Sequence, residues 1–206
     1  MFDTYSDIYD KWYEENKIIA ENEAKAVKVL LEPGFTLEIG VGTGYFAEKL
    51  GVNIGIDPAY KPLLKAKARG IEVIQALGEE LPFRDNIFDN ILLIVTICFL
   101  DKPTEVLKEA WRTLKKGGSI IVCIVPRDSV WGRYYMRLKE EGKSLFYKYA
   151  RLYTVREVEE LLKNTGFKIK GYSATLSFPP QSKPIYEEPS TKPMGYGFVC
   201  IKGVKD

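Results

Sequence analysis

The chain has 206 residues, of which 46% are hydrophobic and 28% charged, with a formal net charge of +2. This length and composition are typical of one globular domain that buries a core, and they exclude a disordered chain. The near balance of charge argues against a nucleic-acid-binding protein, whose affinity normally rests on a strongly cationic surface, so no nucleic-acid partner is expected.

Short apolar runs alternate with stretches of helical periodicity along most of the chain. Helices are predicted at residues 21–31, 45–50, 62–68, 103–116 and 155–164. Strands are predicted at residues 35–39, 53–57, 72–75, 90–95, 119–125, 167–177 and 196–204. The alternation predicts an α/β fold with a Rossmann-like, doubly wound, seven-stranded sheet that is mostly parallel. Because no helical crossover separates the last two strands, we expect an antiparallel terminal strand at one edge.

Two local signals set helix ends in this scheme. Thr154, with Glu157 three residues later, predicts a capping box at the start of the last helix. Gly117 and Gly118 are predicted to end the helix that Pro103 opens, because glycine permits the left-handed turn.

A glycine-rich loop follows the first predicted strand, where residues 37–44 read LEIGVGTG. Glycines let the backbone turn sharply and approach a ligand closely, which predicts a nucleotide-type cofactor. Dinucleotide-binding folds use the spacing G-x-G-x-x-G, whereas Tyr45 stands here where that pattern requires glycine. The loop therefore favours a cofactor other than a dinucleotide; a tight turn without a ligand is the alternative.

Asp57 ends the second predicted strand, at the carboxyl edge of the expected sheet. A carboxylate at that place can accept hydrogen bonds from both ribose hydroxyls of an adenosine. The alternative is a helix cap just before Pro58, a role that is compatible with ligand binding.

Three segments in order, residues 37–50, 55–70 and 78–118, resemble the class I S-adenosylmethionine-dependent methyltransferases. More narrowly, they resemble the group that includes ubiquinone and menaquinone biosynthesis enzymes. The resemblance implies a single methyltransferase domain over residues 1–206, S-adenosyl-L-methionine as cofactor and a small-molecule methyl acceptor as partner. It leaves open whether the acceptor atom is O, N or C, with a small amine or a ring compound as candidates.

The resemblance also implies a set of cofactor-binding residues. The methionine portion and ribose are expected beside Glu38, Gly40, Val41, Gly42 and Gly44, with the ribose hydroxyls on Asp57. The adenine is expected beside Pro58, Ala76, Leu77 and Gly78, and the transferred methyl beside Ile94, Val95 and Thr96. Leu77 stands where the family often has an aspartate, so backbone groups or Glu79 are expected to bind the adenine amine instead.

Residues 1–32 are predicted to form a helical segment over the cofactor site. Its aromatic residues Tyr5, Tyr9, Trp12 and Tyr13 lie at helical spacing. In similar enzymes a tyrosine of this segment meets the methionine carboxylate, and Tyr9 and Tyr13 are the candidates here. A packed aromatic stripe is the equally weighted alternative.

Residues 128–151 form an insertion that is rich in aromatic and basic residues. An extra segment beside the carboxyl ends of the strands predicts a helical substrate lid, with Trp131, Tyr134 and Tyr135 as candidate acceptor contacts. Aromatic faces suit a cationic amine or a flat ring. A helix pair that only caps the core is the alternative.

Several other features are interpreted as structural. The chain has no histidine, which removes the commonest general base and metal ligand, so no metal site is predicted and the catalytic residue is unknown. Cys98, Cys123 and Cys200 lack metal-binding or redox spacing and are predicted to be reduced core thiols. The sequence SFPP at residues 177–180 lies too far along the chain for an amino-methylation motif and is interpreted as a loop.

The N-terminus and the apolar runs of the chain bear on localisation. The N-terminus has no signal-peptide pattern, and the longest apolar run is about half of a membrane span, which predicts a cytoplasmic protein without a membrane span. Two alternatives to a methyltransferase stay open: a non-catalytic S-adenosylmethionine-binding regulator, and a nicotinamide-dependent oxidoreductase.

Overall fold

The fold is taken from a computed structural model, which describes residues 2–144 and 146–206. Met1 and Leu145, each inside a segment predicted to cover the site, lie outside the described residues. The same holds for the side chains of residues 2–7, which include the candidate Tyr5.

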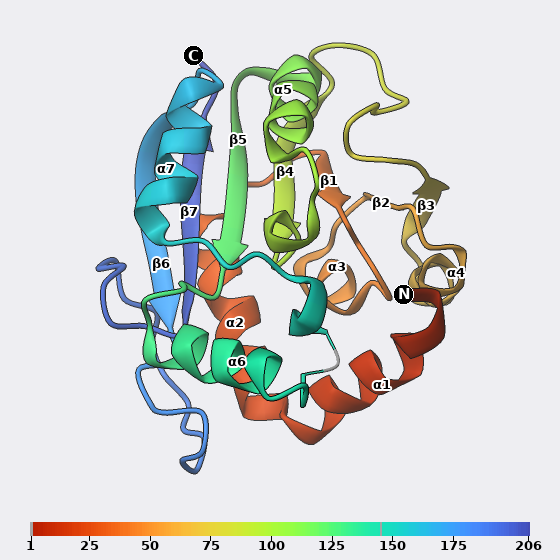
Figure 1. The fold of residues 1–206 in the computed structure, drawn as a ribbon. Helices are drawn as coiled ribbons and strands as arrows, with labels where there is room; N and C mark the ends of the chain where they lie inside the picture. Colours follow the sequence, from red (N-terminus) through yellow and green to blue (C-terminus); the bar gives the residue numbers. More distant parts are fainter. Residues whose placement is uncertain (1, 145) are drawn as a thin grey trace.

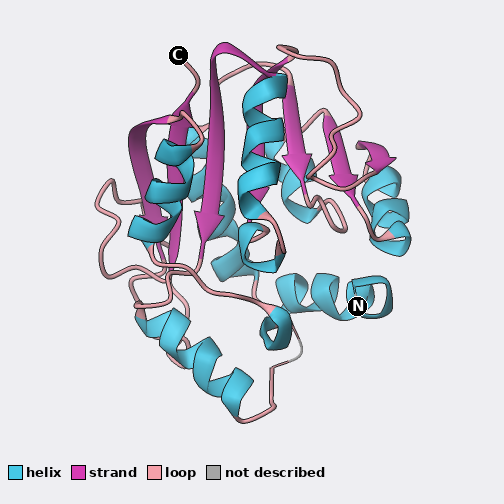
Figure 2. Ribbon diagram, turned by 45° about the horizontal axis from the view of Figure 1, so that its top comes forward, coloured by secondary structure: helices cyan, strands magenta, loops and turns pink. Residues whose placement is uncertain are grey.

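The sheet has seven strands in the order β3-β2-β1-β4-β5-β7-β6 (Figures 1 and 2). The strands are β1 (Thr36–Ile39), β2 (Ile54–Asp57), β3 (Glu72–Gln75), β4 (Phe88–Ile94), β5 (Leu114–Ile124), β6 (Lys168–Thr175) and β7 (Phe198–Val204). Neighbouring strands are parallel except at β7, which runs antiparallel to both β5 and β6. The predicted Rossmann-like sheet with an antiparallel terminal strand is therefore confirmed.

Helices cover both faces of the sheet, because successive strand residues point to opposite sides. The longer helices are α1 (Phe2–Glu15), α2 (Lys17–Leu30), α3 (Tyr45–Leu50), α4 (Tyr60–Ala68), α5 (Pro103–Thr113), α6 (Val130–Glu140) and α7 (Val155–Asn164). Helices α2, α3 and α4 contribute to the core on one face, and α5 and α7 to the core on the other. Helices α1 and α6 lie beyond the carboxyl ends of the parallel strands (Figure 1).

The observed element ends agree with some capping signals and not with others. The capping box of Thr154 and Glu157 is present at the start of α7. Helix α5, however, ends at Thr113, and Leu114 already pairs with Phe88 as the first residue of β5. The prediction that Gly117 and Gly118 end this helix is wrong, because strand pairing already begins at Leu114. The positive φ of Gly117, 78°, lies within the irregular start of β5.

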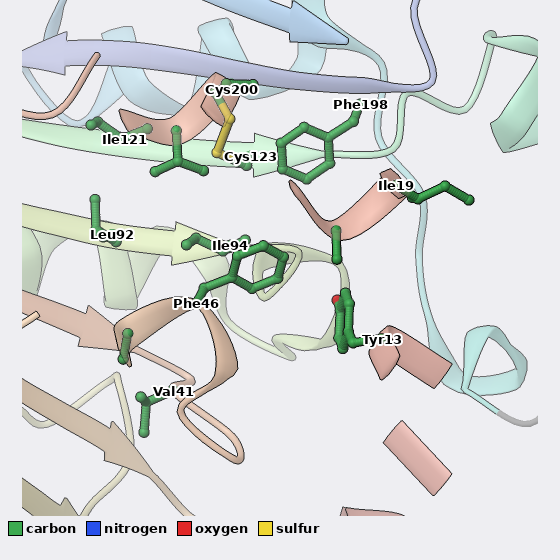
Figure 3. Packing of buried hydrophobic residues seen from close by; sticks show 14 of the residues in the cluster. Tyr13, Ile19, Val41, Phe46, Leu92, Ile94, Ile121, Cys123, Phe198 and Cys200 are labelled. Carbon is green, nitrogen blue, oxygen red and sulfur yellow. A yellow bond between two sulfur atoms is a disulfide. The ribbon is translucent and has the colours of Figure 1, made fainter. Parts of the chain in front are cut away.

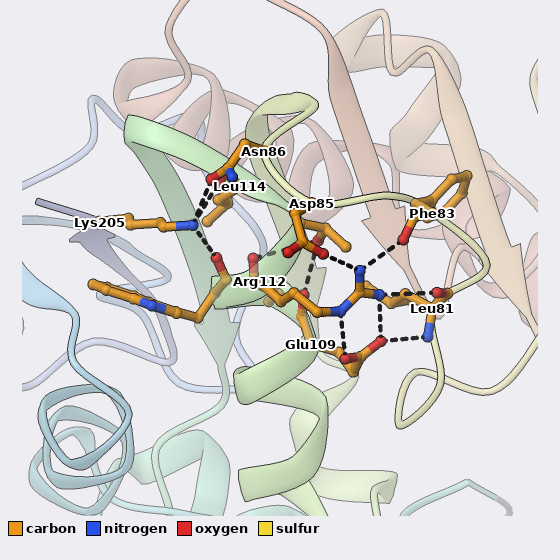
Figure 4. A network of polar contacts seen from close by, with 11 residues as sticks. Leu81, Phe83, Asp85, Asn86, Glu109, Arg112, Leu114 and Lys205 are labelled. Atoms are coloured by element: carbon orange, nitrogen blue, oxygen red, sulfur yellow. Dashed lines mark hydrogen bonds and ion pairs between the residues drawn. The ribbon is translucent and has the colours of Figure 1, made fainter.

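The segment between β3 and β4 is held in place from below by α5 (Figure 4). The guanidinium of Arg112 donates to the carbonyls of Leu81 and Phe83 at 3.1 and 2.8 Å. It also forms ion pairs with Asp85 at 2.7 Å and Glu109 at 2.8 Å. This network indicates a mainly architectural role for the segment between β3 and β4.

Two of the three cysteines form a disulfide, seen as the yellow bond in Figure 3. Cys123 of β5 and Cys200 of β7 are direct register partners in the antiparallel pair, and they are 77 residues apart in sequence. The prediction of three reduced thiols is wrong for this pair, because only the strand register brings the two side chains together. Cys98 is a free, buried thiol, as predicted.

We expect reductant to lower the free energy of unfolding by up to about 4 kcal/mol, because an opened disulfide returns the entropy of a long loop to the unfolded chain. Denaturant unfolding with and without reductant measures this loss. The double variant Cys123→Ala/Cys200→Ala is the control, since its stability should not respond to reductant. Equal free energies of unfolding of the wild type with and without reductant would contradict a stabilising Cys123–Cys200 disulfide.

Candidate active site

A cavity of about 570 Å³ opens at the carboxyl edge of the parallel strands. Its walls include residues that end or follow β1, β2, β4 and β5, together with side chains of α1, α2 and α6. This edge is where open α/β sheets bind ligands, because loops from several strands converge there. Among residues 2–144 and 146–206, no group of three or more Cys, Asp or Glu side chains is placed to hold a metal ion.

The glycine loop forms one end of the cavity. Gly40, Gly42 and Gly44 all have positive φ, at 75°, 53° and 78°. A Cβ on Gly40 would lie 2.4 Å from Thr96, and one on Gly44 would lie 2.9 Å from Ala66. Those two glycines therefore allow close packing, whereas Gly42 meets nothing within 4 Å and lines the cavity.

Asp57 fixes this loop from the end of β2. Its carboxylate accepts the backbone N–H of Gly42 at 3.0 Å and that of Ala59 at 2.8 Å. Ala59 directly precedes α4, which begins at Tyr60, so the side chain of Asp57 also contacts the start of this helix. Asp57 is 8% exposed and lines the cavity, so its position is compatible with a ligand there.

Glu38 is a second carboxyl group at this end, on β1. It is 2% exposed, and its Oε2 has no hydrogen-bond partner among the described residues. Burial, and next the charge of Asp57, hold the pKa of this carboxyl well above its usual range. A buried polar atom without a partner is costly unless a ligand or water satisfies it.

The segment after β4 closes the floor of the cavity. Ile94, Val95 and Thr96 all line it. Val95 has φ of 52°, which is an outlier for a β-branched residue. Such strained backbone clusters at functional sites, where the surrounding structure holds it.

Aromatic side chains of α1 and α6 also line the cavity. Tyr9 and Tyr13 of α1 line it, with their hydroxyls 3.0 Å apart. Trp131 of α6 also lines it and donates its indole N–H to the carbonyl of Phe178 at 2.7 Å. Tyr135 lines it too and stacks on Tyr147 with ring centroids 4.1 Å apart.

Comparison with known proteins agrees with this geometry. Residues 37–122 match a family described as a methyltransferase domain. An uncharacterized protein of Methanocaldococcus jannaschii is 45% identical over 168 residues, covering 82% of this chain and 81% of that protein. A crystal structure from Thermotoga maritima is described as an S-adenosylmethionine-dependent methyltransferase, possible histamine N-methyltransferase. Its sequence is 38% identical to this chain, and the two structures superpose with a TM-score of 0.95. The match covers 100% of this chain and 98% of that chain.

The chain belongs to the class I S-adenosylmethionine-dependent methyltransferases. An uncharacterized protein of Mycobacterium tuberculosis shares 36% identity over 202 residues, covering 95% of this methyltransferase and 70% of that protein. Because the chain belongs to this family, the alternative of a nicotinamide-dependent oxidoreductase is rejected. Within the described part of the chain, no helix is both long and apolar enough to cross a bilayer.

The methyltransferase fold brings most of the predicted site residues to one cavity. Those that line it are Tyr9, Tyr13, Gly40, Gly42, Asp57, Pro58, Ala76, Leu77, Gly78, Ile94, Val95, Thr96, Trp131 and Tyr135. Four do not line it: Glu38, Val41, Gly44 and Tyr134. Val41 is in the core beneath the loop, and Tyr134 packs beside Tyr135 and Arg137, so its prediction as an acceptor contact finds no support in this position.

Glu23 is the main site residue that the sequence prediction missed. It lies on α2, is 6% exposed and lines the cavity. Burial alone raises the pKa of its carboxyl to about 8, and within the described residues no hydrogen bond or ion pair holds it. The sequence does contain a sign of this role: Glu23 is an acidic residue on the same helix face as Ala20 and Val27, which are buried.

We expect Glu23→Gln to weaken the dependence of stability on pH. The folded pKa of Glu23 is about 8, against about 4.3 in an unfolded chain. Between those values the folded state holds a proton that the unfolded state lacks, so stability is lost as the pH rises through 8. The melting temperature of the wild type should therefore fall more between about pH 5.5 and 8.5 than that of the variant.

Glu21→Gln is the matched control, because Glu21 is exposed on the same helix and should keep the wild-type pH profile. Parallel profiles for the wild type and Glu23→Gln would show that the carboxyl of Glu23 titrates normally.

Proposed function

We propose that this methyltransferase transfers a methyl group from S-adenosylmethionine to a small-molecule acceptor in the aromatic end of the cavity. The observation that carries the proposal is the continuity of the cavity. Gly42 and Asp57 line it together with the aromatic side chains of α1 and α6. A non-catalytic sensor needs only the cofactor end, so the extra enclosed space favours an enzyme.

The residues beside the glycine loop fit the cofactor. We infer that Asp57 accepts hydrogen bonds from the ribose hydroxyls. Glu38, beneath the glycine loop, has a buried Oε2 without a hydrogen-bond partner among the described residues, which leaves it available to the cofactor. Ala76, Leu77 and Gly78, after β3, would border the adenine with Pro58. These roles are supported by placement and by family membership.

S-adenosylmethionine, when bound, supplies an electrophilic methyl group on a sulfonium sulfur. The contribution of the chain is alignment and exclusion of water, since the cofactor carries the reactive group. Ile94 and Val95 offer an apolar floor where the positive charge is lost during transfer. Residues 1–32 and 128–151 are proposed to cover the site within one methyltransferase domain that spans residues 1–206.

Relatives with named activities differ in their acceptor atom. One is a phosphatidylethanolamine N-methyltransferase, 29% identical over 47% of this chain, and another a malonyl-[acyl-carrier protein] O-methyltransferase, 26% identical over 63%. The Thermotoga maritima structure is described as a possible histamine N-methyltransferase. The names include nitrogen and oxygen acceptors, so they do not choose the acceptor atom.

Asp57→Ala should weaken the binding of S-adenosylhomocysteine at least tenfold, or about 1.4 kcal/mol, because the ribose loses its carboxylate and the loop loses its anchor. Calorimetry on samples shown to be folded measures the change. Asp89→Asn, in the cavity-distal part of β4, is the control and should bind normally. An unchanged affinity of Asp57→Ala would reject the ribose assignment.

A further inference from the structure

The cavity contains a buried carboxyl group that the cofactor assignments do not use. Glu23 lies on α2, which packs against β5, β6 and β7. The ribose candidate Asp57 ends β2, on the other side of β4 in the sheet order. Burial, and next the charge of Asp57, raises the pKa of Glu38, whereas burial alone raises that of Glu23.

An unpaired carboxylate is expensive at this degree of burial. Transfer of an unpaired charge out of water costs several kcal/mol, and a protein avoids the cost by holding the group neutral. The raised pKa of Glu23, about 8, indicates that neutral state in the empty cavity. A side chain that lines a cavity in this condition is satisfied when a ligand brings the opposite charge.

The surroundings of Glu23 are aromatic. Tyr9 and Tyr13 of α1, Tyr135 of α6 and Tyr147 line the same cavity as Glu23. Burial raises the pKa values of all four tyrosines, and Glu23 is a smaller cause in each case. The tyrosines form two close ring pairs, with centroids 4.9 Å apart for Tyr9–Tyr13 and 4.1 Å apart for Tyr135–Tyr147. Aromatic faces attract a cation, above all where water is excluded.

The other charges of the cavity favour the same sign of ligand. Among its described lining residues, the carboxyl-bearing side chains are Glu23, Asp57, Glu79 and Asp101. Lys143 is the cationic one, and its ammonium is paired with Glu141 at 2.8 Å. The lining therefore presents an excess of acidic groups to an incoming ligand.

We propose that the carboxylate of Glu23, in the cavity that Tyr9, Tyr13, Tyr135 and Tyr147 also line, binds the protonated amino group of an amine acceptor. The methyl group is then transferred to nitrogen. This inference rests on the proposed function and names the substrate class of the same site.

Glu23 also has the chemistry to prepare the amine. An ammonium N–H bond breaks with its electron pair left on nitrogen, and an O–H bond forms on the carboxylate of Glu23. The freed lone pair forms the new N–C bond, while the methyl–sulfur bond breaks and leaves its electrons on sulfur. Glu23 is ionised in this complex because the ammonium compensates its charge, so its carboxylate can accept the proton.

The test measures binding by calorimetry in the presence of saturating S-adenosylhomocysteine. The probes are propylamine, hexylamine, 2-phenylethylamine and tryptamine, each compared with the alcohol of the same carbon skeleton. At least one amine should bind the wild type about tenfold or more tightly than its alcohol. Glu23→Gln should remove this preference and leave the binding of the alcohol and of S-adenosylhomocysteine within about twofold. Glu21→Gln should keep the preference.

Proton release provides a second readout. At pH 7 an arriving ammonium displaces most of the proton held by Glu23, so the heat of binding should vary with the ionisation enthalpy of the buffer. The titratable side chains that face Glu23 are Tyr9, Tyr13, Tyr45, Tyr135 and Tyr147, whose raised pKa values keep them neutral at this pH. Glu23→Gln should abolish the release.

Each failure has a distinct meaning. If no amine binds better than its alcohol while S-adenosylhomocysteine binds normally, the amine proposal is overturned and the proposed function stands. If Glu23→Gln weakens S-adenosylhomocysteine instead of the amine, the carboxylate serves the cofactor and the proposal is again overturned. If the folded wild type does not bind S-adenosylhomocysteine, both proposals fail.

Discussion

The contact between Asp57 and the backbone of Gly42 joins the second strand to the glycine loop, and the geometry of the site depends on it. Positive φ at Gly40 and Gly44 brings the loop close to Thr96 and Ala66, so the loop also touches the segment after β4 and helix α4. The carboxylate of Asp57 thus joins the glycine loop to the segment before α4, while the glycines pack the loop against Thr96 and Ala66.

The aromatic part of the cavity lining is built differently, from side chains on helices that lie outside the sheet. Tyr13 of α1 stacks on Tyr45 of α3 with ring centroids 4.5 Å apart, and Tyr135 of α6 stacks on Tyr147. The first contact connects the N-terminal helix to the main fold, and the second holds two parts of the insertion together. Because helices at the edge of a domain can shift more readily than strands in a sheet, we infer that this part adapts to the acceptor.

How much the sequence predicts depends on whether the signal is local. The capping box of Thr154 and the glycine loop depend on neighbours in the chain, and the structure has them where the sequence places them. The disulfide depends on the register of β5 against β7, over a separation of 77 residues, and no local pattern encodes that register. The sequence also could not distinguish Tyr134 from Tyr135. Of these two, Tyr135 lines the cavity, because the orientation of α6 decides which side chain faces inward.

Glu23 shows why a pattern of burial and a pattern of chemistry must be considered together. Helical periodicity places it among apolar residues, where a structural interpretation expects another apolar side chain. Its retention there lowers the stability of the empty fold at neutral pH, because the carboxyl must either stay protonated or carry an uncompensated charge. The same cost gives selectivity, since a neutral isostere of an ammonium ligand leaves the buried carboxyl without a countercharge. A site of this kind rejects analogues that lack the charged group more strongly than an apolar pocket can discriminate by size.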